Sequence, residues 1–526
     1  MRITDHFPLT IVVGTLLGAY LSPIVGHVRR RWLPPFAVGV TLLALIQAIQ
    51  LNIRVRDCGE LTYQLGGWPA PWGIELLVGP AAALMVLVLA AISTLIAVYC
   101  MAYIDHEVAP HAQSWYYAAF LLLLAGMLGM AVTNDLFNTF VMMEITTIGA
   151  CALVAAKDSR RAAEAALRYL LLASLASTLI LLGIGMIYMI TGNLNLTYLT
   201  RELETVWRQY PRLATTSLGL LTLGFALKAA LFPLHVWLPE AHSAAPTPSS
   251  AMLSGLVVKI YAFSLIKMNY VVFRPILGIV APLRELLILL SAAAIIGGSL
   301  FALVQDDIKR LLAYSTVAQV GYIFLGAGLG TPSAVMAAFF QIISHSIMKT
   351  CLFLSAGIIA ERTGRRKIAL MDGMGRVLPL TSAAFTVAAL SMIGLPLLSG
   401  FIAKWHLFLG GLEAERPVFI GLILMSGLLN AAYYLPVIWR FYFVEPQVCP
   451  VIHGDPAGDA GALGAPGSWP PPGIRRRILS RLEAPLPMLL PVVALALACI
   501  VLGVWTGPTI AHLAGVAQTI IGGPGR

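Results

Sequence analysis

Apolar runs dominate this sequence, and they recur from one end to the other with short polar or Pro/Gly-rich turns between them. Each run is about 18 to 25 residues long, which is the length of helix needed to cross about 30 Å of hydrocarbon. Only 11% of the 526 residues are charged, whereas a typical soluble domain has about 25%. The chain cannot cover a water-facing surface, so the sequence predicts an all-α polytopic membrane protein.

The runs predict about fourteen transmembrane helices. They cover residues 9–25, 35–52, 79–102, 115–133, 136–156, 167–190, 214–237, 248–270, 282–304, 309–330, 332–360, 378–410, 417–443 and 486–506. We expect four regions: N-terminal helices with an outside loop at 1–114, a core at 115–443, a flexible cytoplasmic loop at 444–485, and a C-terminal helix and tail at 486–526.

Basic residues cluster in the turns between the runs. The clusters are Arg29–Arg31, Lys157/Arg160/Arg161, Lys309/Arg310, Arg362/Arg365/Arg366/Lys367 and Arg475–Arg477. In the predicted arrangement they all fall on one side, and the positive-inside rule places that side in the cytoplasm. We therefore expect an inner (cytoplasmic) membrane protein with both termini outside. The net charge of +10 reflects this topology, and no nucleic-acid partner is indicated.

Two of the predicted spans are interrupted. Leu231-Phe232-Pro233 breaks the seventh span and Gly394-Leu395-Pro396 breaks the twelfth, because proline lacks the backbone donor and clashes with the preceding turn. If spans 4–8 and 9–13 are two five-helix units, both breaks fall on the fourth helix of a unit. Two odd-numbered units in series have opposite topology, as in transporters with inverted repeats. Spacing alone leaves open that the match is chance, since prolines are common in membrane helices.

Several ionisable residues lie inside apolar runs. They are Glu144, Lys228, Lys259, His345, Lys349 and Lys404. A charged side chain at the centre of a spanning helix costs about 2.5 to 3.5 kcal/mol on insertion scales, so the set would cost more than about 10 kcal/mol if left unpaired. These groups must therefore pair or meet water. Structural ion pairs or snorkelling lysines explain a single lysine near a span end better than they explain the whole set.

The types of these residues favour proton transfer. Desolvation lowers the pKa of any lysine and a nearby carboxylate raises it, so a Glu144–Lys228 pair can hold a proton when closed and release it when open. Lys259, His345 and Lys404 would continue as a hydrated relay, and histidine suits this role because one ring nitrogen can accept while the other donates. Lys349 either joins the relay or modulates His345, which lies on the same helix face.

Other polar residues are expected to have roles outside the proton relay. His235, Glu240 and His242 follow the Pro233 break, and we expect them to line an access path and not to bind a metal. Asp135 is expected to be a helix cap, while Glu107 falls in a loop expected to be solvated.

Cofactor motifs are absent from the sequence. The six cysteines show no metal-ligand spacing, and there is no phosphate loop, dinucleotide fingerprint, nucleophile elbow or haem motif. We expect no cofactor, so energy must come from an ion gradient or from partner subunits.

Four segments carry a resemblance to a known family. They are residues 134–144 (NDLFNTFVMME), 226–242 (ALKAALFPLHVWLPEAH), 311–322 (LLAYSTVAQVGY) and 344–350 (SHSIMKT). The chain resembles the antiporter-like membrane subunits shared by respiratory complex I, energy-converting hydrogenases and Mrp-type multisubunit cation/proton antiporters. The resemblance implies fourteen helices with inverted five-helix repeats. It also implies that Glu144, Lys228, Lys259 and Lys404 carry protons, with His345 on the connecting axis.

Within this family the D-type Mrp subunits are the most similar. Residues 63–75 and Lys404, which follows Gly400-Phe401, resemble that branch. One departure is Gly79, near which the family often has an aspartate. The expected function is that of a non-enzymatic subunit that exchanges H+ for Na+ or K+ inside a hetero-oligomer of membrane subunits. The alternatives are a proton-pumping subunit of an NADH dehydrogenase or membrane-bound hydrogenase, and a scaffold whose charges are structural.

Overall fold

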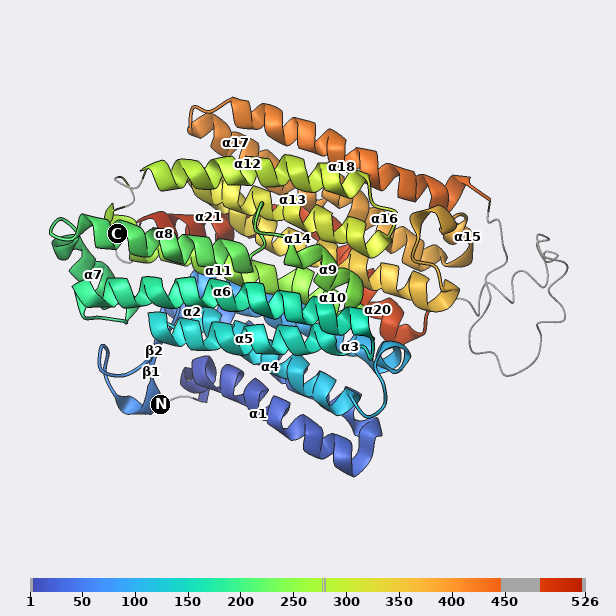
Figure 1. The fold of residues 1–526 in the computed structure, drawn as a ribbon, viewed down its shortest axis with the longest axis horizontal. Coiled ribbons are helices and arrows are strands. Elements are labelled where there is room, and N and C mark those ends of the chain that lie inside the picture. The colour runs from blue at the N-terminus through green and yellow to red at the C-terminus, as the bar shows by residue number, and fades with distance from the viewer. Residues whose placement is uncertain (1–2, 277, 279–280, 446–482, 523–526) are drawn as a thin grey trace.

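The computed structural model describes residues 3–276, 278, 281–445 and 483–522. Within them the chain is helical apart from one short hairpin, and the long helices run roughly along one common direction (Figure 1). The first half contains α1 (Phe7–Arg29), α2 (Leu33–Cys58), α3 (Pro80–Glu107), α4 (Gln113–Val132), α5 (Leu136–Ala155), α6 (Arg160–Thr191), α7 (Leu196–Val206), α8 (Pro211–Lys228), α9 (Trp237–Ala244), α10 (Thr247–Met252) and α11 (Val258–Lys267).

The second half contains α12 (Ala281–Leu303), α13 (Ile308–Leu329), α14 (Pro332–Thr363), α15 (Met374–Val377), α16 (Pro379–Ile393), α17 (Ser399–Glu413), α18 (Val418–Phe443), α20 (Leu486–Val504) and α21 (Gly507–Gly522). The predicted cytoplasmic loop at 444–485 lies almost entirely outside the described residues. The predicted outside loop is an ordered antiparallel hairpin, in which β1 (Leu61–Gln64) pairs with β2 (Glu75–Val78) and Leu61 lies opposite Val78.

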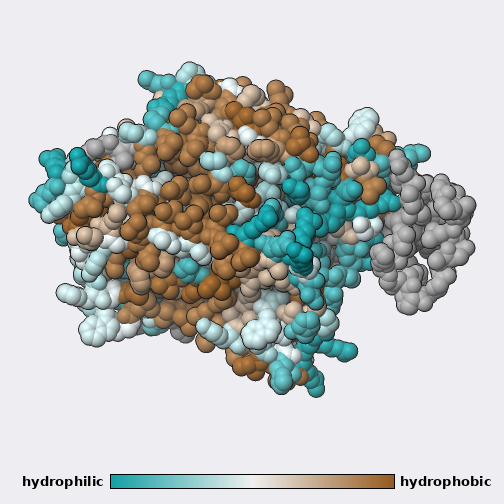
Figure 2. All heavy atoms as spheres, viewed as in Figure 1, coloured by the Kyte–Doolittle hydropathy of each residue, from teal (hydrophilic) through white to brown (hydrophobic). Residues whose placement is uncertain are grey.

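The helix lengths and the surface fit a bilayer. Among the described residues, eleven helical segments are long and apolar enough to cross a membrane, and the first of them, Phe7–Cys58, contains both α1 and α2. The exact count of fourteen and the inverted repeat stay predictions. Figure 2 shows hydrophobic residues across the middle of one face and hydrophilic residues towards both ends. Large side chains such as Leu171 and Leu428 are exposed on the chain's helices, as expected of a lipid-facing surface.

The two ends of the bundle differ in charge. At one end Arg366 donates to the carbonyl of Ser243 and pairs with Asp307, while Arg161 donates to the Ser243 hydroxyl. We call this the inner end, because the positive-inside rule places it in the cytoplasm. At the opposite, outer end the hairpin meets the α4–α5 and α6–α7 turns, where the Asn134 amide donates to the Glu75 carbonyl. Figure 1 shows the hairpin, α7 and α21 together at this end.

Both predicted helix breaks are confirmed. α8 ends at Lys228 and α9 begins at Trp237, and between them the indole of Trp237 donates to the freed carbonyl of Leu227 at 3.0 Å. α16 ends at Ile393 and α17 begins at Ser399. Gly394 there has φ of +95°, a conformation that glycine adopts without steric cost. A broken helix leaves unpaired carbonyls inside the bundle, and these must find partners there.

The sequence analysis missed α21. Residues after 506 were predicted to be a tail, but Gly507–Gly522 is helical. Its buried residues are Leu513, Val516, Ala517 and Ile520, and this spacing places them on one helix face. The same 3.6-residue periodicity was present in the sequence and identifies the helix.

Candidate functional site

Glu144 and Lys228 form an ion pair in the interior of the bundle. Lys228 is the last residue of α8, and its ammonium lies 3.2 Å from Glu144 Oε1 and 2.6 Å from the Thr147 hydroxyl. The Lys228 side chain is 1% exposed and that of Glu144 is 33% exposed. Ser177 of α6 donates its hydroxyl to the same Glu144 oxygen. The lysine is thus enclosed, whereas its counter-ion reaches the flank of the bundle.

Lys259 lies where the eighth predicted span changes helix type. A π-helical turn, η4 (Leu253–Val257), directly precedes α11, and Lys259 donates to the carbonyl of Ser254 within that turn. Wide turns of this kind leave backbone carbonyls free and often occur at functional sites. Lys259 is completely buried. Among the described residues, no carboxylate lies within ion-pair distance of it.

His345 and Lys349 lie one turn apart on α14, as predicted, and both are completely buried. Lys349 donates to the carbonyl of Leu312 at 2.7 Å and to the Ser315 hydroxyl, and it lies 3.5 Å from the Tyr434 hydroxyl. Neither ring nitrogen of His345 has a hydrogen-bond partner among the described residues. A buried imidazole without a partner is free to bond to water or to an adjacent proton carrier.

Lys404 lies at the second helix break. It is half-buried on α17, and its ammonium donates to the carbonyls of Met392 and Ile393, at 2.9 and 2.8 Å. These carbonyls end α16, where the helix dipole is negative and favours a cation. The ammonium also lies 5.3 Å from the centre of the Tyr322 ring, which adds a cation–π attraction. Lys404 is therefore held by backbone, whereas Lys228 is held by a carboxylate.

Hydroxyl groups connect Lys259 with Lys349. The Ser254 hydroxyl lies 2.8 Å from that of Thr316, and the Thr316 hydroxyl donates to the carbonyl of Leu312. That carbonyl also accepts from Lys349. A short row of polar groups therefore runs from α11 through α13 to α14, and it lies inside otherwise apolar helices.

A second row extends from Lys349 to Lys404. The Tyr434 hydroxyl lies 3.0 Å from that of Ser315, and the ring of Tyr434 contacts that of Tyr433. Tyr433 donates to Asn430, whose amide donates to the Met392 carbonyl that also accepts from Lys404. Three of the predicted residues, Lys259, Lys349 and Lys404, are thus joined by polar and ring contacts across α11, α13, α14, α18, α16 and α17. Among the described residues, no hydrogen bond joins the Glu144–Lys228 pair or His345 to this row. The sequence analysis missed the linking hydroxyl and amide groups, because such residues are common in membrane helices and carry no distinctive spacing.

Two expectations about the inner end are wrong. Glu107 is not in a solvated loop: its carboxylate pairs with Lys157, lies 3.9 Å from Lys309 and accepts from the backbone of Thr247 at 2.6 Å. Lys309 does not belong to an exposed basic loop, since it is 1% exposed and donates to the carbonyl of Ala245. Packing of α13 against α9 and of α10 against α3 buries both groups, and a single sequence does not display that packing.

The remaining polar residues make separate contacts and do not form a common site. Asp135 is the N-cap of α5, as predicted, and accepts from the backbone of Asn138 at 2.7 Å. Burial raises its pKa. Glu240 is exposed and pairs with Arg168, while His242 stacks on Phe353 inside the bundle. Among the described residues, no group of three or more histidines, cysteines or acids is placed to hold a metal ion.

This geometry defines a class of protein. Long apolar helices enclose buried lysines, a histidine and a row of hydroxyls, and the same bundle holds a carboxylate–lysine pair next to a helix break. Such an arrangement is characteristic of ion-translocating membrane subunits. Comparison with known proteins leads to the same class of protein. Residues 133–430 match the family "NADH:quinone oxidoreductase/Mrp antiporter, TM", and the chain belongs to this family.

Individual relatives come from both branches of that family. An NADH-quinone oxidoreductase subunit of the N type from Desulforudis audaxviator is 37% identical over 97% of this chain and 98% of its own length. A Na(+)/H(+) antiporter subunit of the D type from Alkalihalophilus pseudofirmus is 31% identical over 80% of this chain and 84% of its own. A chain of the Mrp complex from a Dietzia species superimposes with a TM-score of 0.85 at 25% identity, covering 99% of this chain and 98% of its own length. The chain is accordingly an antiporter-like membrane subunit that resembles members of multisubunit complexes.

Proposed function

We propose that this chain moves protons across the membrane, and that Glu144, Lys228, Lys259, His345, Lys349 and Lys404 carry them. The observation that supports the proposal most directly is the Glu144–Lys228 pair, in which an enclosed ammonium faces one carboxylate and one hydroxyl. A purely structural ion pair would not need three further lysines in the same bundle, linked to one another through polar groups.

The pair acts as a switch in this proposal. While Glu144 is close, its negative charge stabilises the ammonium of Lys228, and when the carboxylate moves away the ammonium loses its counter-ion. The proton then passes to the neutral amine of Lys259 through water, so that Lys228 becomes neutral and Lys259 becomes charged. The Tyr261 ring lies 5.7 Å from the Lys228 ammonium and belongs to α11, the helix that also carries Lys259.

The partial exposure of Glu144 suggests that a partner subunit covers this side of the chain. One third of its side chain is exposed on the flank of α5, where neighbouring residues such as Ile148 are exposed and apolar. A carboxylate facing lipid is costly, so we propose that a second membrane subunit covers this flank. Its approach would change the surroundings of Glu144 and thereby the strength of the pair.

Two kinds of complex fit this function. Our first candidate is a D-type subunit of an Mrp-like Na+/H+ or K+/H+ antiporter, supported by the TM-score of 0.85 to a chain of the Mrp complex. The second is a proton-pumping subunit of a redox-driven complex, favoured by the 37% identity to an NADH-quinone oxidoreductase subunit over nearly the whole length.

Purified complete complex in sealed vesicles separates the two candidates. For an antiporter, adding Na+ or K+ collapses an imposed pH gradient, as reported by a trapped pH dye, and choline does not. For a redox-driven subunit these cations have no effect, and an electron donor with quinone generates the gradient. If neither treatment moves protons while the complex stays assembled, the chain is a scaffold and the proposed function is wrong.

A further inference from the structure

A cavity with several charged residues in its wall lies at the outer end, apart from the row that joins Lys259, Lys349 and Lys404. Its volume is about 320 Å³, and its wall is built from the start of α3, from α7, from the end of α11 and from α21. A single water needs roughly 10–15 Å³ of such space, so the cavity is large enough for a group of waters. Charged residues line it: Glu60, Arg201, Glu204, Lys267 and Arg274. Glu60, Arg201 and Glu204 are exposed, so the cavity is continuous with the outer aqueous phase.

Lys267 links this cavity with the buried row. It is the last residue of α11, the helix that carries Lys259 near its other end. The two lysines are eight residues apart, which corresponds to about 12 Å along a helix. Phe263, midway between them, also lines the cavity. The cavity wall therefore reaches α11 about one helical turn, or about 6 Å along the helix, from the backbone of Lys259. The Lys259 ammonium itself bonds to the Ser254 carbonyl, at the other end of the span.

The helix is irregular at both lysines. The π-helical turn η4 ends directly before α11, and a second one, η5 (Met268–Val272), begins directly after Lys267. Two such turns in one span are uncommon in a purely structural helix, and they frequently accompany function. Lys267 donates to the carbonyl of Thr133 at 2.7 Å, at the end of α4. Among the described residues, no carboxylate lies within ion-pair distance of it.

Glu60 supplies the nearest acid. Its carboxylate lies against Gly79, where an added Cβ would be only 3.1 Å from Glu60 Oε1. Gly79 therefore leaves room for a carboxylate that comes from the hairpin, at the positive N-terminal end of α3. Glu60 is also within electrostatic range of Lys267. An acid at the mouth of the cavity and a lysine at its base are suited to pass a proton through the water between them.

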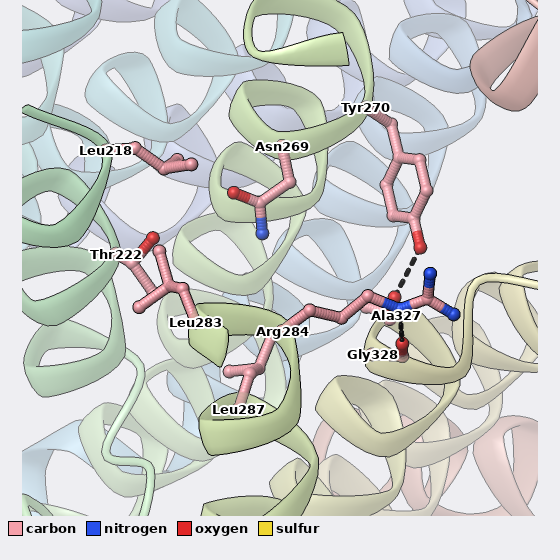
Figure 3. Close-up of a pocket in the computed structure, with 9 residues that line it drawn as sticks. All are labelled: Leu218, Thr222, Asn269, Tyr270, Leu283, Arg284, Leu287, Ala327 and Gly328. Atoms are coloured by element: carbon pink, nitrogen blue, oxygen red, sulfur yellow. Dashed lines mark hydrogen bonds between the residues drawn. The ribbon is translucent and has the colours of Figure 1, made fainter. Parts of the chain in front are cut away.

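A smaller pocket lies next to this cavity. It has a volume of about 30 Å³ and shares Tyr270 with the larger cavity (Figure 3). Figure 3 shows Tyr270 and Arg284 bonded to the carbonyls of Ala327 and Gly328 at the end of α13. Both of these groups already have partners, and the pocket has no lysine, histidine or carboxylate in its wall.

We propose that the larger cavity is an outward access route, in which Lys267 exchanges protons between Lys259 and the outer aqueous phase through water and Glu60. The proposal rests on the proposed function. The ammonium of Lys259 gives its proton through water to the neutral amine of Lys267, and Lys267 then releases a proton to Glu60 or to water. The groups that face Lys267 are Glu60, Arg201 and Glu204 of α7, Tyr270, and Arg274.

Water access is tested first, because it does not depend on activity. The starting variant is the complete complex in which the six cysteines of this chain, including the exposed Cys58 and the partly exposed Cys151, are replaced by serine. One cysteine is then introduced at a time, by Phe263→Cys, Lys267→Cys or Ile266→Cys. A membrane-impermeant cationic thiol reagent is added from the outer side or the inner side. We expect the first two variants to react at least 10-fold faster from the outside. Ile266 is buried and does not line the cavity, so its variant should stay unreactive. Equal protection of all three variants overturns the proposal.

The role of Lys267 is tested with Lys267→Arg. Arginine keeps the positive charge and the hydrogen bond to Thr133, but it does not release its proton. If Lys267 only supports the structure, this variant keeps wild-type proton flux, and the proposal is wrong. If Lys267 transfers protons, flux in sealed vesicles falls at least 10-fold in both Lys267→Arg and Lys267→Met. Glu144→Gln is measured in parallel: its failure to lower flux refutes the proposed function, whereas a low flux in Glu144→Gln with normal flux in Lys267→Arg refutes only the access route.

Discussion

Replacing Glu144 by glutamine tests the switch directly. The substitution keeps the size of the side chain and removes its charge, so the Lys228 ammonium loses its only carboxylate within ion-pair distance among the described residues. At the observed N–O separation of 3.2 Å, the Coulomb energy is about 1.3 kcal/mol in water and about 5 kcal/mol at an effective dielectric constant near 20. Because Glu144 is one-third exposed, a value near the lower part of this range applies, about 2 kcal/mol.

A loss of about 2 kcal/mol lowers the proton affinity of Lys228 by about 30-fold. Proton flux through the complete complex in vesicles should fall by about 10- to 100-fold, with unchanged assembly on native gels. Glu164→Gln is the matched control, since Glu164 forms an exposed pair with Arg160 on the surface of α6 and exposed pairs contribute little. Wild-type flux in Glu144→Gln, with the complex intact, would refute the reasoning from the ion pair.

Two further substitutions probe groups that the sequence did not single out. Tyr434→Phe removes the hydroxyl next to Ser315 and Lys349. We expect a 3- to 10-fold slower proton flux with an unchanged melting temperature, because one hydrogen-bonded link of the row is lost. An unchanged flux would exclude Tyr434 from the row. Glu107→Gln leaves the buried Lys309 without its anion, so we expect destabilisation by about 3 kcal/mol, seen as a lower melting temperature of the purified complex. An unaltered melting temperature would show that Lys309 is neutral in the folded protein.

Much of the architecture could be predicted from the sequence, because it follows from local rules. Segment length and hydropathy set the spans, and proline chemistry set the breaks at Pro233 and Pro396. The cost of burying charge singled out Glu144 and Lys228 before any contact was known, and the structure places them in contact. The proton-carrying roles that we assign to the buried residues are still predictions.

The features that the sequence did not predict depend on how helices pack against one another. Glu107 and Lys309 stand at the ends of apolar runs, where solvation is the usual outcome, and the packing of α3 with α10 and of α13 with α9 buries them. The partners of Lys404 are main-chain carbonyls, which every residue has and which no sequence pattern marks. The outer cavity is formed by residues from separate segments of the chain, including the unpredicted α21.

Lys228 and Lys404 lie at the two helix breaks but have different partners, and the type of partner limits how each lysine can release a proton. Glu144 is a side chain, so a rotation of a few bonds or a neighbouring charge is enough to weaken its hold on Lys228. Carbonyls at the end of α16 have no such freedom, since they move only when the chain around Gly394 and Leu397 moves with them. We therefore expect rapid, side-chain-controlled release at the first lysine, and at the second a slower step that requires the helix itself to shift.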